Sequence, residues 1–262
     1  MYPFEVFLGM GMYELLIALG FFCALLYFRV FADRFGFGAN LQNLVIVCAM
    51  AALIGGYCFA VLTQAVYNAL DEGKFEIVNT TGATFYGGLI GGAGLFIGIY
   101  FLAGRFVLKR GESVEHFYRL SDIAAGSIAV AHGLGRLGCL FAGCCHGANT
   151  DAWYGIYHHY VDARVVPVQL FEAIFLFALC GFLTWRLLKG KHNNLAIYLM
   201  AYAVWRFLAE YLRADDRGAT VVSFLSPSQL TALALFLLGA GLLTGATVAK
   251  NKETVRVEHE EA

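Results

Sequence analysis

Long apolar stretches separated by short polar connections run through most of the 262-residue chain. A helix needs about 20 predominantly apolar residues to cross the hydrocarbon core of a bilayer. Seven stretches meet this requirement, approximately Tyr13–Phe31, Leu44–Tyr67, Phe85–Gly104, Leu120–Ala142, Val168–Leu188, Leu195–Leu212 and Ser228–Ala249. The pattern therefore predicts an all-α polytopic membrane protein with seven transmembrane helices. Because the connections are short, we expect a single transmembrane domain over residues 1–262, with a charged tail at about residues 250–262.

Composition and charge agree with this class. Hydrophobic residues make up 60% of the chain and charged residues 14%, which is typical of a membrane protein rather than of a soluble domain with a large core. The formal net charge is −1, and the basic residues form no stripe along the sequence. We therefore expect no nucleic-acid partner.

The basic residues also indicate the orientation of the chain. An odd number of spans places alternate connections on opposite sides of the membrane, and cytoplasmic connections carry an excess of Lys and Arg. One set of connections holds only four basic residues, Lys74, Arg164, Arg213 and Arg217. The other set holds twelve, namely Arg29, Arg34, Arg105, Lys109, Arg110, Arg119, Arg186, Lys189, Lys191, Lys250, Lys252 and Arg256. We predict that the N-terminus lies outside and the C-terminus in the cytoplasm.

Polar and charged side chains occur inside the fourth predicted span and directly after it. His132 and Arg136 are four residues apart, so they share one face of a helix. An arginine near the bilayer midplane costs roughly 2.5–3.5 kcal/mol on insertion scales, so such residues usually face a polar interior and serve a function. Three cysteines follow within the segment Ala131–Asn149, at positions 139, 144 and 145.

The fifth and sixth predicted spans carry further candidates. Gln169 and Glu172 lie near the start of the fifth span. In the sixth, Tyr202, Arg206 and Glu210 follow one another at intervals of four, and Arg213 comes next on the same stripe. Arg206 and Glu210 can simply neutralise each other as a buried pair. Because Glu210 satisfies at most part of two guanidinium groups, the alternative is an anionic phosphodiester held between Arg136 and Arg206.

A glycine-rich stretch, Thr81–Gly98, opens the third predicted span. Gly87 and Gly91, Gly88 and Gly92, and Gly94 and Gly98 form three small-xxx-small pairs, which allow helix backbones to approach closely. Close helix packing accounts for these glycines. It does not account for Tyr86, which brings a hydroxyl group into the same region.

The cysteines allow several interpretations. Cys23, Cys48, Cys58 and Cys180 lie singly in spans and are simplest as small core residues. For Cys139, Cys144 and Cys145 we expect a structural role, either a disulfide or packing around the glycine turn, rather than a metal site.

These segments together resemble the prolipoprotein diacylglyceryl transferase family over nearly the whole chain. Tyr13 falls on an early tyrosine of the family, and Tyr202, Arg206, Glu210 and Arg213 match its Y-x-x-x-R-x-x-x-E-x-x-R helix in full. In the family's G-R-x-G-N-F-x-N-G-E run, Gly135, Arg136, Gly138 and Gly143 match, whereas Cys139, Ala142 and Cys144 replace the asparagines and the glutamate. Two further runs match at Phe85, Gly87, Gly88, Leu89 and Gly91, with Tyr86 in place of a histidine, and at Pro167, Gln169, Leu170 and Glu172.

The resemblance implies an enzyme of the bacterial cytoplasmic membrane. In this family the lipobox cysteine thiol of a prolipoprotein displaces glycerol phosphate from phosphatidylglycerol, which leaves a diacylglyceryl thioether. The implied catalytic residues are Arg136 and Arg206 for the phosphate, with His132 or Tyr86 as the base. The implied substrate-binding residues are Tyr13, Gly135, Gly138, Gln169, Glu172, Tyr202, Glu210 and Arg213. The partners are phosphatidylglycerol, the signal peptide and membrane lipid, and we expect a monomer without cofactor or metal.

Three other interpretations remain open at this point. A paralogous transferase would use the same lipid donor with a different acceptor. A redox or metal protein would use Cys139, Cys144, Cys145 and His146, although their spacing is not a common zinc pattern. A transporter would hold a solute with its buried charges, but the sequence contains no visible internal repeat.

Overall fold

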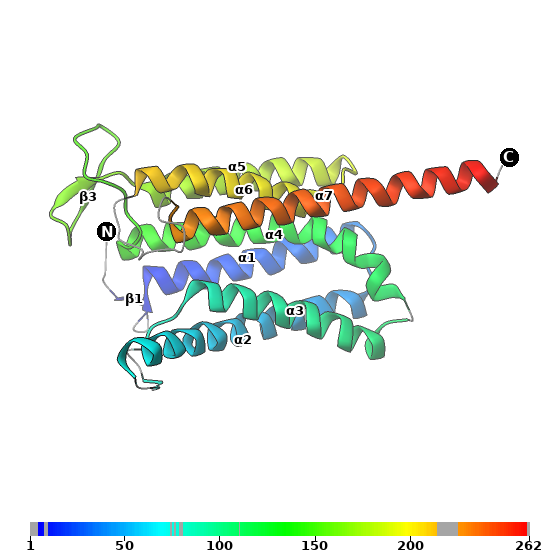
Figure 1. Ribbon diagram of the computed structural model, residues 1–262, viewed down its shortest axis with the longest axis horizontal. Coiled ribbons are helices and arrows are strands. Elements are labelled where there is room, and N and C mark those ends of the chain that lie inside the picture. The colour runs from blue at the N-terminus through cyan, green and yellow to red at the C-terminus, as the bar shows by residue number, and fades with distance from the viewer. Residues whose placement is uncertain are drawn as a thin grey trace. The chain divides into compact units, whose positions relative to one another are not determined.

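The computed structural model describes residues 5–7, 10–73, 75, 77–78, 81–109, 111–213 and 225–260. Seven helices in these ranges are long and apolar enough to cross a membrane. They are α1 (Met12–Arg34), α2 (Ala39–Glu72), α3 (Phe85–Val107), α4 (Glu112–Ala142), α5 (Val168–Leu188), α6 (Asn194–Ala209, continued by the 3-10 turn η1, Glu210–Leu212) and α7 (Pro227–Glu260) (Figure 1). The seven long apolar helices that the sequence predicts are thereby confirmed, and they are consistent with a polytopic membrane protein.

The observed elements differ from the expected ones mainly at their ends. Helix α4 begins at Glu112 rather than near Leu120, and α7 continues as helix through the charged tail to Glu260. Two short antiparallel hairpins were not predicted, β1 (Glu5–Phe7) with β2 (Met10–Gly11) and β3 (Ile156–His158) with β4 (Ala163–Val165). Strands of two or three residues carry too little alternation to stand out in a sequence.

The helices form two compact units, which we describe separately. One unit comprises residues 29–118 and includes α2 and α3, and the other comprises residues 1–28 and 119–262. The sequence predicted one transmembrane domain over the whole chain, and that organisation stays a prediction.

Glycines bring α2 and α3 together within the first of these units. A Cβ atom added to Gly88 would lie 3.3 Å from the Gly56 carbonyl oxygen, and one added to Gly91 would lie 2.5 Å from Cβ of Phe59. The pairs Gly87/Gly91 and Gly88/Gly92 therefore serve the close packing that their spacing predicted. The third pair does not, because a Cβ atom on Gly94 or Gly98 would meet no other described atom within 4 Å.

The second unit packs small residues of α4 against large residues of α5 and α6. Its buried core comprises Ala125, Ala129, Leu176, Leu179, Leu183, Tyr198 and Tyr202. Helix α1 also approaches α4 closely, since a Cβ atom on Gly20 would lie 3.0 Å from the Ala131 carbonyl oxygen. Alanine and glycine on α4 thus leave room for the aromatic and polar side chains of the neighbouring helices.

A buried carboxylate fixes the start of α6. Asp122 of α4 accepts a hydrogen bond of 2.7 Å from the backbone nitrogen of Asn194, the first residue of α6, and a second of 3.0 Å from Nδ1 of His192. The first backbone N–H groups of a helix have no partner within the helix, and the helix dipole favours negative charge at this end. Asp122 therefore ties α4 to the start of α6.

Candidate active site

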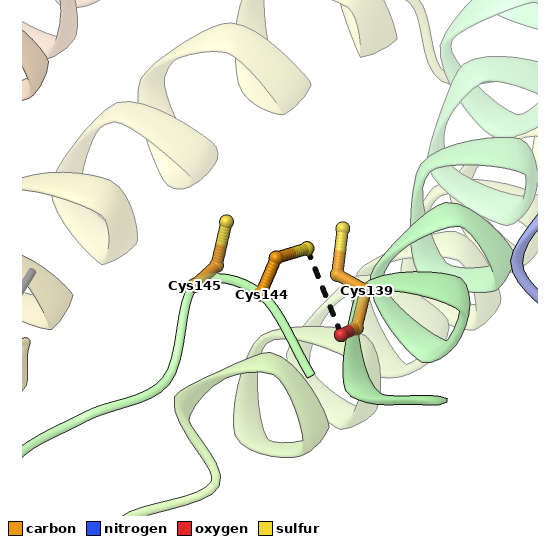
Figure 2. Close-up of side chains that lie close together, drawn as sticks. All are labelled: Cys139, Cys144 and Cys145. Atoms are coloured by element: carbon orange, nitrogen blue, oxygen red, sulfur yellow. Dashed lines mark hydrogen bonds between the residues drawn. The ribbon is translucent and has the colours of Figure 1, made fainter. Parts of the chain in front are cut away.

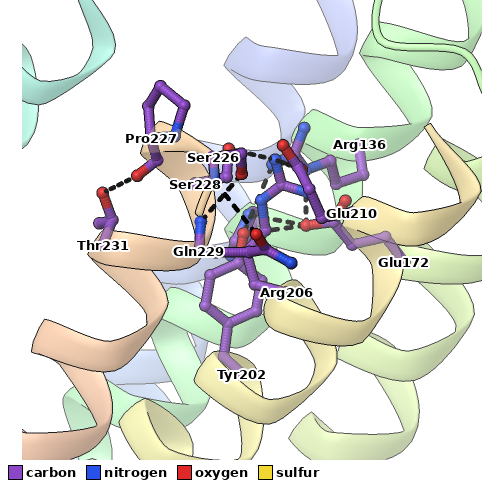
Figure 3. A network of polar contacts seen from close by, with 11 residues as sticks. Arg136, Glu172, Tyr202, Arg206, Glu210, Ser226, Pro227, Ser228, Gln229 and Thr231 are labelled. Carbon is purple, nitrogen blue, oxygen red and sulfur yellow. Dashed lines mark hydrogen bonds and ion pairs between the residues drawn. The ribbon is translucent and has the colours of Figure 1, made fainter. Parts of the chain in front are cut away.

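The carboxylate of Glu172 lies at the centre of a polar cluster between α4, α5 and α6. Its side chain is fully buried. Nε of Arg136 lies 3.0 Å from Oε1 of Glu172, and the Tyr202 hydroxyl donates a hydrogen bond of 2.9 Å to the same oxygen (Figure 3). Arg136 Nη2 also donates to the Tyr202 hydroxyl at 3.4 Å. Polar groups from three helices therefore meet at one carboxylate oxygen.

His132 completes this cluster from the same face of α4 as Arg136. Its Nδ1 lies 3.0 Å from the Tyr198 hydroxyl, and its ring makes an edge contact with the Tyr202 ring at a centroid distance of 4.7 Å. Its Nε2 is 4.0 Å from Oε1 of Glu172, which is too long for a hydrogen bond. We call Glu172, Arg136, His132, Tyr198 and Tyr202 the Glu172 cluster. As the i, i+4 spacing predicted, His132 and Arg136 share one helix face, and both side chains lie beside Glu172 and Tyr202.

Arg206 forms a second polar centre one turn after Tyr202. Its Nη2 lies 3.0 Å from Oε2 of Glu210 and donates a hydrogen bond of 2.7 Å to the Ser228 hydroxyl of α7. The arginine is only 7% exposed, so the charge is buried together with its partner. Tyr202 precedes Arg206 by four residues on α6 and contacts Arg136 through its hydroxyl, so it lies on the same helix face as one arginine and binds the other.

One charge argument from the sequence is wrong. From the sequence, Glu210 was the only acid considered for the two arginines, and it satisfies at most part of both, but the structure gives Arg136 a carboxylate of its own, Glu172 from α5. A lipid phosphate is therefore not needed to neutralise either arginine. The guanidinium of Arg136 has five N–H donors. Its contacts with Glu172 and Tyr202, both among the described residues, are made through Nε and Nη2.

The remaining predicted residues occupy several places. Gly135 and Gly138 face α1, since a Cβ atom on Gly138 would lie 3.2 Å from Cδ2 of Tyr13 and one on Gly135 would lie 3.6 Å from Cδ1 of Ile17. Only Gly138 is tightly packed, since a Cβ atom on Gly135 would make an ordinary contact, and the part of both glycines in substrate binding stays a prediction. Tyr86 is the second residue of α3 in the other unit, and its role as a base also stays a prediction.

Gln169 and Arg213 both contact the cysteine-containing loop after α4. Gln169 donates a hydrogen bond of 2.5 Å from Nε2 to the Cys144 carbonyl oxygen, and the backbone of Arg213 pairs with Gly147. Thiol hydrogen bonds from Cys139 and Cys144, together with the Arg213 guanidinium, lower the pKa of Cys145. All seven cysteines are free thiols, so the disulfide that the sequence allowed is not formed in this structure.

The comparison with known proteins decides the family. The sequence model of the family described as prolipoprotein diacylglyceryl transferase matches residues 3–244. The chain is 33% identical over 239 residues to the phosphatidylglycerol–prolipoprotein diacylglyceryl transferase 2 of Clostridium perfringens (strain 13 / Type A), covering 88% of each chain. It is 30% identical over 245 residues to the phosphatidylglycerol–prolipoprotein diacylglyceryl transferase of Clostridium tetani (strain Massachusetts / E88), covering 90% of this chain and 93% of that one. The chain belongs to the prolipoprotein diacylglyceryl transferase family.

Family membership confirms the resemblance inferred from the motifs, and the structure adds two residues that the sequence reading missed. Tyr198 binds His132, and Ser228 binds Arg206. Tyr198 precedes Tyr202 by four residues, so its place on the same helix face was available from the spacing. Ser228 comes from a separate helix, and no local pattern connects it with Arg206.

Proposed function

We propose that this chain is a phosphatidylglycerol–prolipoprotein diacylglyceryl transferase embedded in the bacterial cytoplasmic membrane. The observation that carries the proposal is the family match over residues 3–244, together with two close relatives that bear this name. Seven helices of membrane-spanning length agree with a lipid donor and a signal-peptide acceptor that both enter from the bilayer. A paralogous enzyme with another acceptor is not favoured by these relatives.

The reaction transfers a diacylglyceryl group from a phosphate oxygen to a thiol sulfur. The sulfur of the acceptor cysteine attacks the glyceryl carbon next to the phosphate, a C–S bond forms, and the C–O bond to the phosphate breaks. Glycerol phosphate departs with the bonding electrons, and the thiol proton goes to a base. The site must therefore bind an anionic headgroup, stabilise the charge that develops on the leaving phosphate, and accept one proton.

Arg136 is the group that we assign to the phosphate. Glu172 and Tyr202 hold one edge of its guanidinium, and 16% of its side chain is exposed. An arginine that is fixed in this way is preorganised, so little reorientation is needed when negative charge develops on the leaving oxygen. Interactions that strengthen in the transition state accelerate the chemical step.

Arg206 is the second positive group that we assign to the leaving phosphate. It is held by Glu210 and Ser228 and lies within electrostatic range of Tyr202. Because Glu210 already partners Arg206, the proposed contribution is a positioned guanidinium fork rather than an excess of charge.

His132 is the base that we propose for the acceptor thiol. Its Nδ1 is held by the Tyr198 hydroxyl, so Nε2 is the ring nitrogen that can accept a proton. The side chain is 22% exposed, and Nε2 faces Glu172 at 4.0 Å. A phenol with a pKa of about 10 is a poorer base at neutral pH, so His132 is preferred to Tyr86.

The orientation of the chain in the membrane and its substrates are part of the proposed function. The uneven distribution of basic residues supports a seven-span chain with its N-terminus outside and its C-terminus in the cytoplasm. Phosphatidylglycerol and the prolipoprotein signal peptide are the proposed substrates, and a monomer without cofactor is the proposed active form.

Complementation tests the function as a whole. A bacterial strain depleted of its own transferase should grow, and should convert a tagged prolipoprotein to its lipid-modified form, when this chain is expressed. Arg136→Ala, confirmed at wild-type level in the membrane, is the matched negative control. Wild-type protein that inserts normally but restores neither growth nor modification would contradict the proposal and point to a different acceptor.

A further inference from the structure

Three thiols converge directly after α4. The sulfur atoms of Cys139, Cys144 and Cys145 all lie within 4.8 Å of one another (Figure 2). Cys139 comes from the last turn of α4, and the other two follow the turn at Gly143, whose φ is +77°. Cys144 is exposed and the other two are partly exposed, so small molecules can reach the group. We call these three residues the thiol cluster.

The loop that carries the thiol cluster is held by its neighbours on several sides. Nε2 of His158 donates a hydrogen bond of 2.7 Å to the Gly143 carbonyl oxygen, and Gln169 donates to the Cys144 carbonyl oxygen. Cys145 itself has a φ of +64°, a left-handed conformation that non-glycine residues seldom adopt. Such strained residues persist only where the surroundings enforce them, and they occur preferentially at functional sites.

The charges around Cys145 favour its thiolate. The titratable groups that act on it are Cys139 from α4, Cys144 from the same loop, Arg213 after η1 and Tyr13 at the start of α1. Hydrogen bonds from the thiols of Cys139 and Cys144 and the nearby guanidinium of Arg213 lower the pKa of Cys145. The thiolate is the nucleophilic form of cysteine, and a neighbouring arginine is a common cause of reactivity.

We propose that the thiol cluster is a redox-active site that reduces low-molecular-weight disulfides, with Cys145 as the nucleophile and Cys139 as the resolving thiol. The Cys145 thiolate attacks one sulfur of the disulfide, a mixed disulfide forms, and the other half leaves as a thiolate. Cys139 loses its proton to this thiolate and attacks the Cys145 sulfur, which releases the second half as a thiolate. The Cys145 thiolate and the Cys139 thiol are oxidised to one disulfide, and the small disulfide is reduced to one thiol and one thiolate.

Cys139 fits the resolving role better than Cys144 does. Adjacent residues joined by a trans peptide have Cα atoms about 3.8 Å apart, whereas disulfides usually need about 4.4–6.8 Å between Cα atoms. A bridge between Cys144 and Cys145 would therefore distort the loop. Cys139 lies on the end of α4, six positions earlier in the chain, and its sulfur is already beside the other two.

A cation is the less favoured occupant of this site. Among the described residues the group offers three sulfur ligands, and structural zinc sites usually have four protein ligands. A bound cation would also lie close to the guanidinium of Arg213, which stabilises a thiolate on Cys145 but repels a metal ion. The same guanidinium supports thiol–disulfide exchange.

The test uses the reduced full-length protein in phosphatidylglycerol-containing nanodiscs, treated with glutathione disulfide under anaerobic conditions and analysed by intact mass after an acid quench. At pH 6, where ordinary thiols react slowly, the wild-type protein should lose two hydrogens without keeping an adduct. Cys139→Ser should instead retain one glutathione on Cys145. The rate of Cys145→Ser should be lower than that of the wild-type protein by about tenfold or more. Cys58→Ser changes an exposed thiol of α2 and should leave the fast reaction unchanged.

The pH profile separates a positioned thiolate from an accessible thiol. The rate of an ordinary thiol with a pKa of about 8.5 rises roughly tenfold per pH unit between pH 6 and 8, whereas the Cys145 rate should stay nearly flat. Arg213→Gln should make the rate rise more steeply with pH than it does in the wild-type protein, because one of the groups that favour the Cys145 thiolate is removed. A wild-type rate that rises as steeply as that of the isolated thiols, a glutathione adduct that persists on the wild-type protein, or stoichiometric zinc that is lost in Cys144→Ser would each overturn the proposal. None of these readouts depends on the transferase activity.

Discussion

Glu172 is the residue on which the arrangement of the polar centre depends. It is fully buried, and a single one of its oxygens receives Arg136 from α4 and Tyr202 from α6. A buried ion pair is strongly destabilised when one partner is removed, because the remaining charge has no compensation. Glu172 therefore both permits an arginine at this depth and fixes the direction in which its guanidinium points.

Replacing Glu172 by Gln should lower both stability and activity. Breaking a buried ion pair of this kind costs roughly 3–5 kcal/mol, and the freed Arg136 side chain would lose its fixed orientation. Thermal unfolding in detergent and transfer of labelled phosphatidylglycerol measure the two effects. Glu115→Gln removes an exposed carboxylate near the start of α4 and serves as the control. An unfolding temperature equal to that of the control would contradict the structural role.

His132→Gln should abolish transfer while leaving the protein folded. Glutamine can still bond with the Tyr198 hydroxyl that holds Nδ1 of His132, but it accepts no proton at neutral pH. His159→Gln changes an exposed histidine of the β3–β4 hairpin and should leave transfer unchanged. The measurement is initial transfer rate on monodisperse protein, and near-normal turnover by His132→Gln would exclude this histidine as the base.

At the scale of elements, glycine on α3 decides how closely α2 approaches. Gly91 faces the Phe59 side chain of α2, whereas Gly94 has no described neighbour within 4 Å of an added Cβ atom. Where an added methyl group meets no neighbour, replacing Gly by Ala in a helix is favourable by up to about 1 kcal/mol. The two positions therefore separate packing from helix propensity.

Gly91→Ala should destabilise the protein by roughly 1–3 kcal/mol, because the new methyl group would overlap the Phe59 side chain. Gly94→Ala, three residues further along the same helix, should be neutral or slightly stabilising. Thermal unfolding of both variants in one detergent gives the comparison. Equal shifts would mean that α2 and α3 do not meet at Gly91.

How much of this the sequence predicts depends on whether a feature is local. The helices follow from apolar length, and the shared faces of His132 with Arg136 and of Tyr202 with Arg206 follow from i, i+4 spacing. Spacing also predicted three glycine pairs, but it cannot show which helix face lies against α2, and so it included Gly94 and Gly98. Likewise the partner of Arg136 comes from α5, and no local pattern distinguishes Glu172 from Glu210 for that role.

At the scale of the whole molecule, the asymmetry of basic residues predicts one orientation. Twelve basic residues on one set of connections against four on the other predict a cytoplasmic C-terminus. Reporter fusions after Lys191 and after Lys252 should both report the cytoplasm, and a fusion after Tyr160 should report the exterior. An external signal from either of the first two fusions would contradict the orientation.

Transfer of a labelled diacylglyceryl group from phosphatidylglycerol to a lipobox peptide, with purified protein in nanodiscs, tests the central claim most directly. The wild-type protein should label a peptide with cysteine at the acceptor position and not its serine counterpart. Arg136→Lys and Arg206→Lys keep the charge but lose the planar fork, so each should lose about 100-fold or more in rate, since removing one positioned donor commonly costs this much. Wild-type-like transfer by both lysine variants would contradict the proposed fork geometry. Wild-type-like transfer by Arg136→Ala and Arg206→Ala would contradict the phosphate-binding role itself.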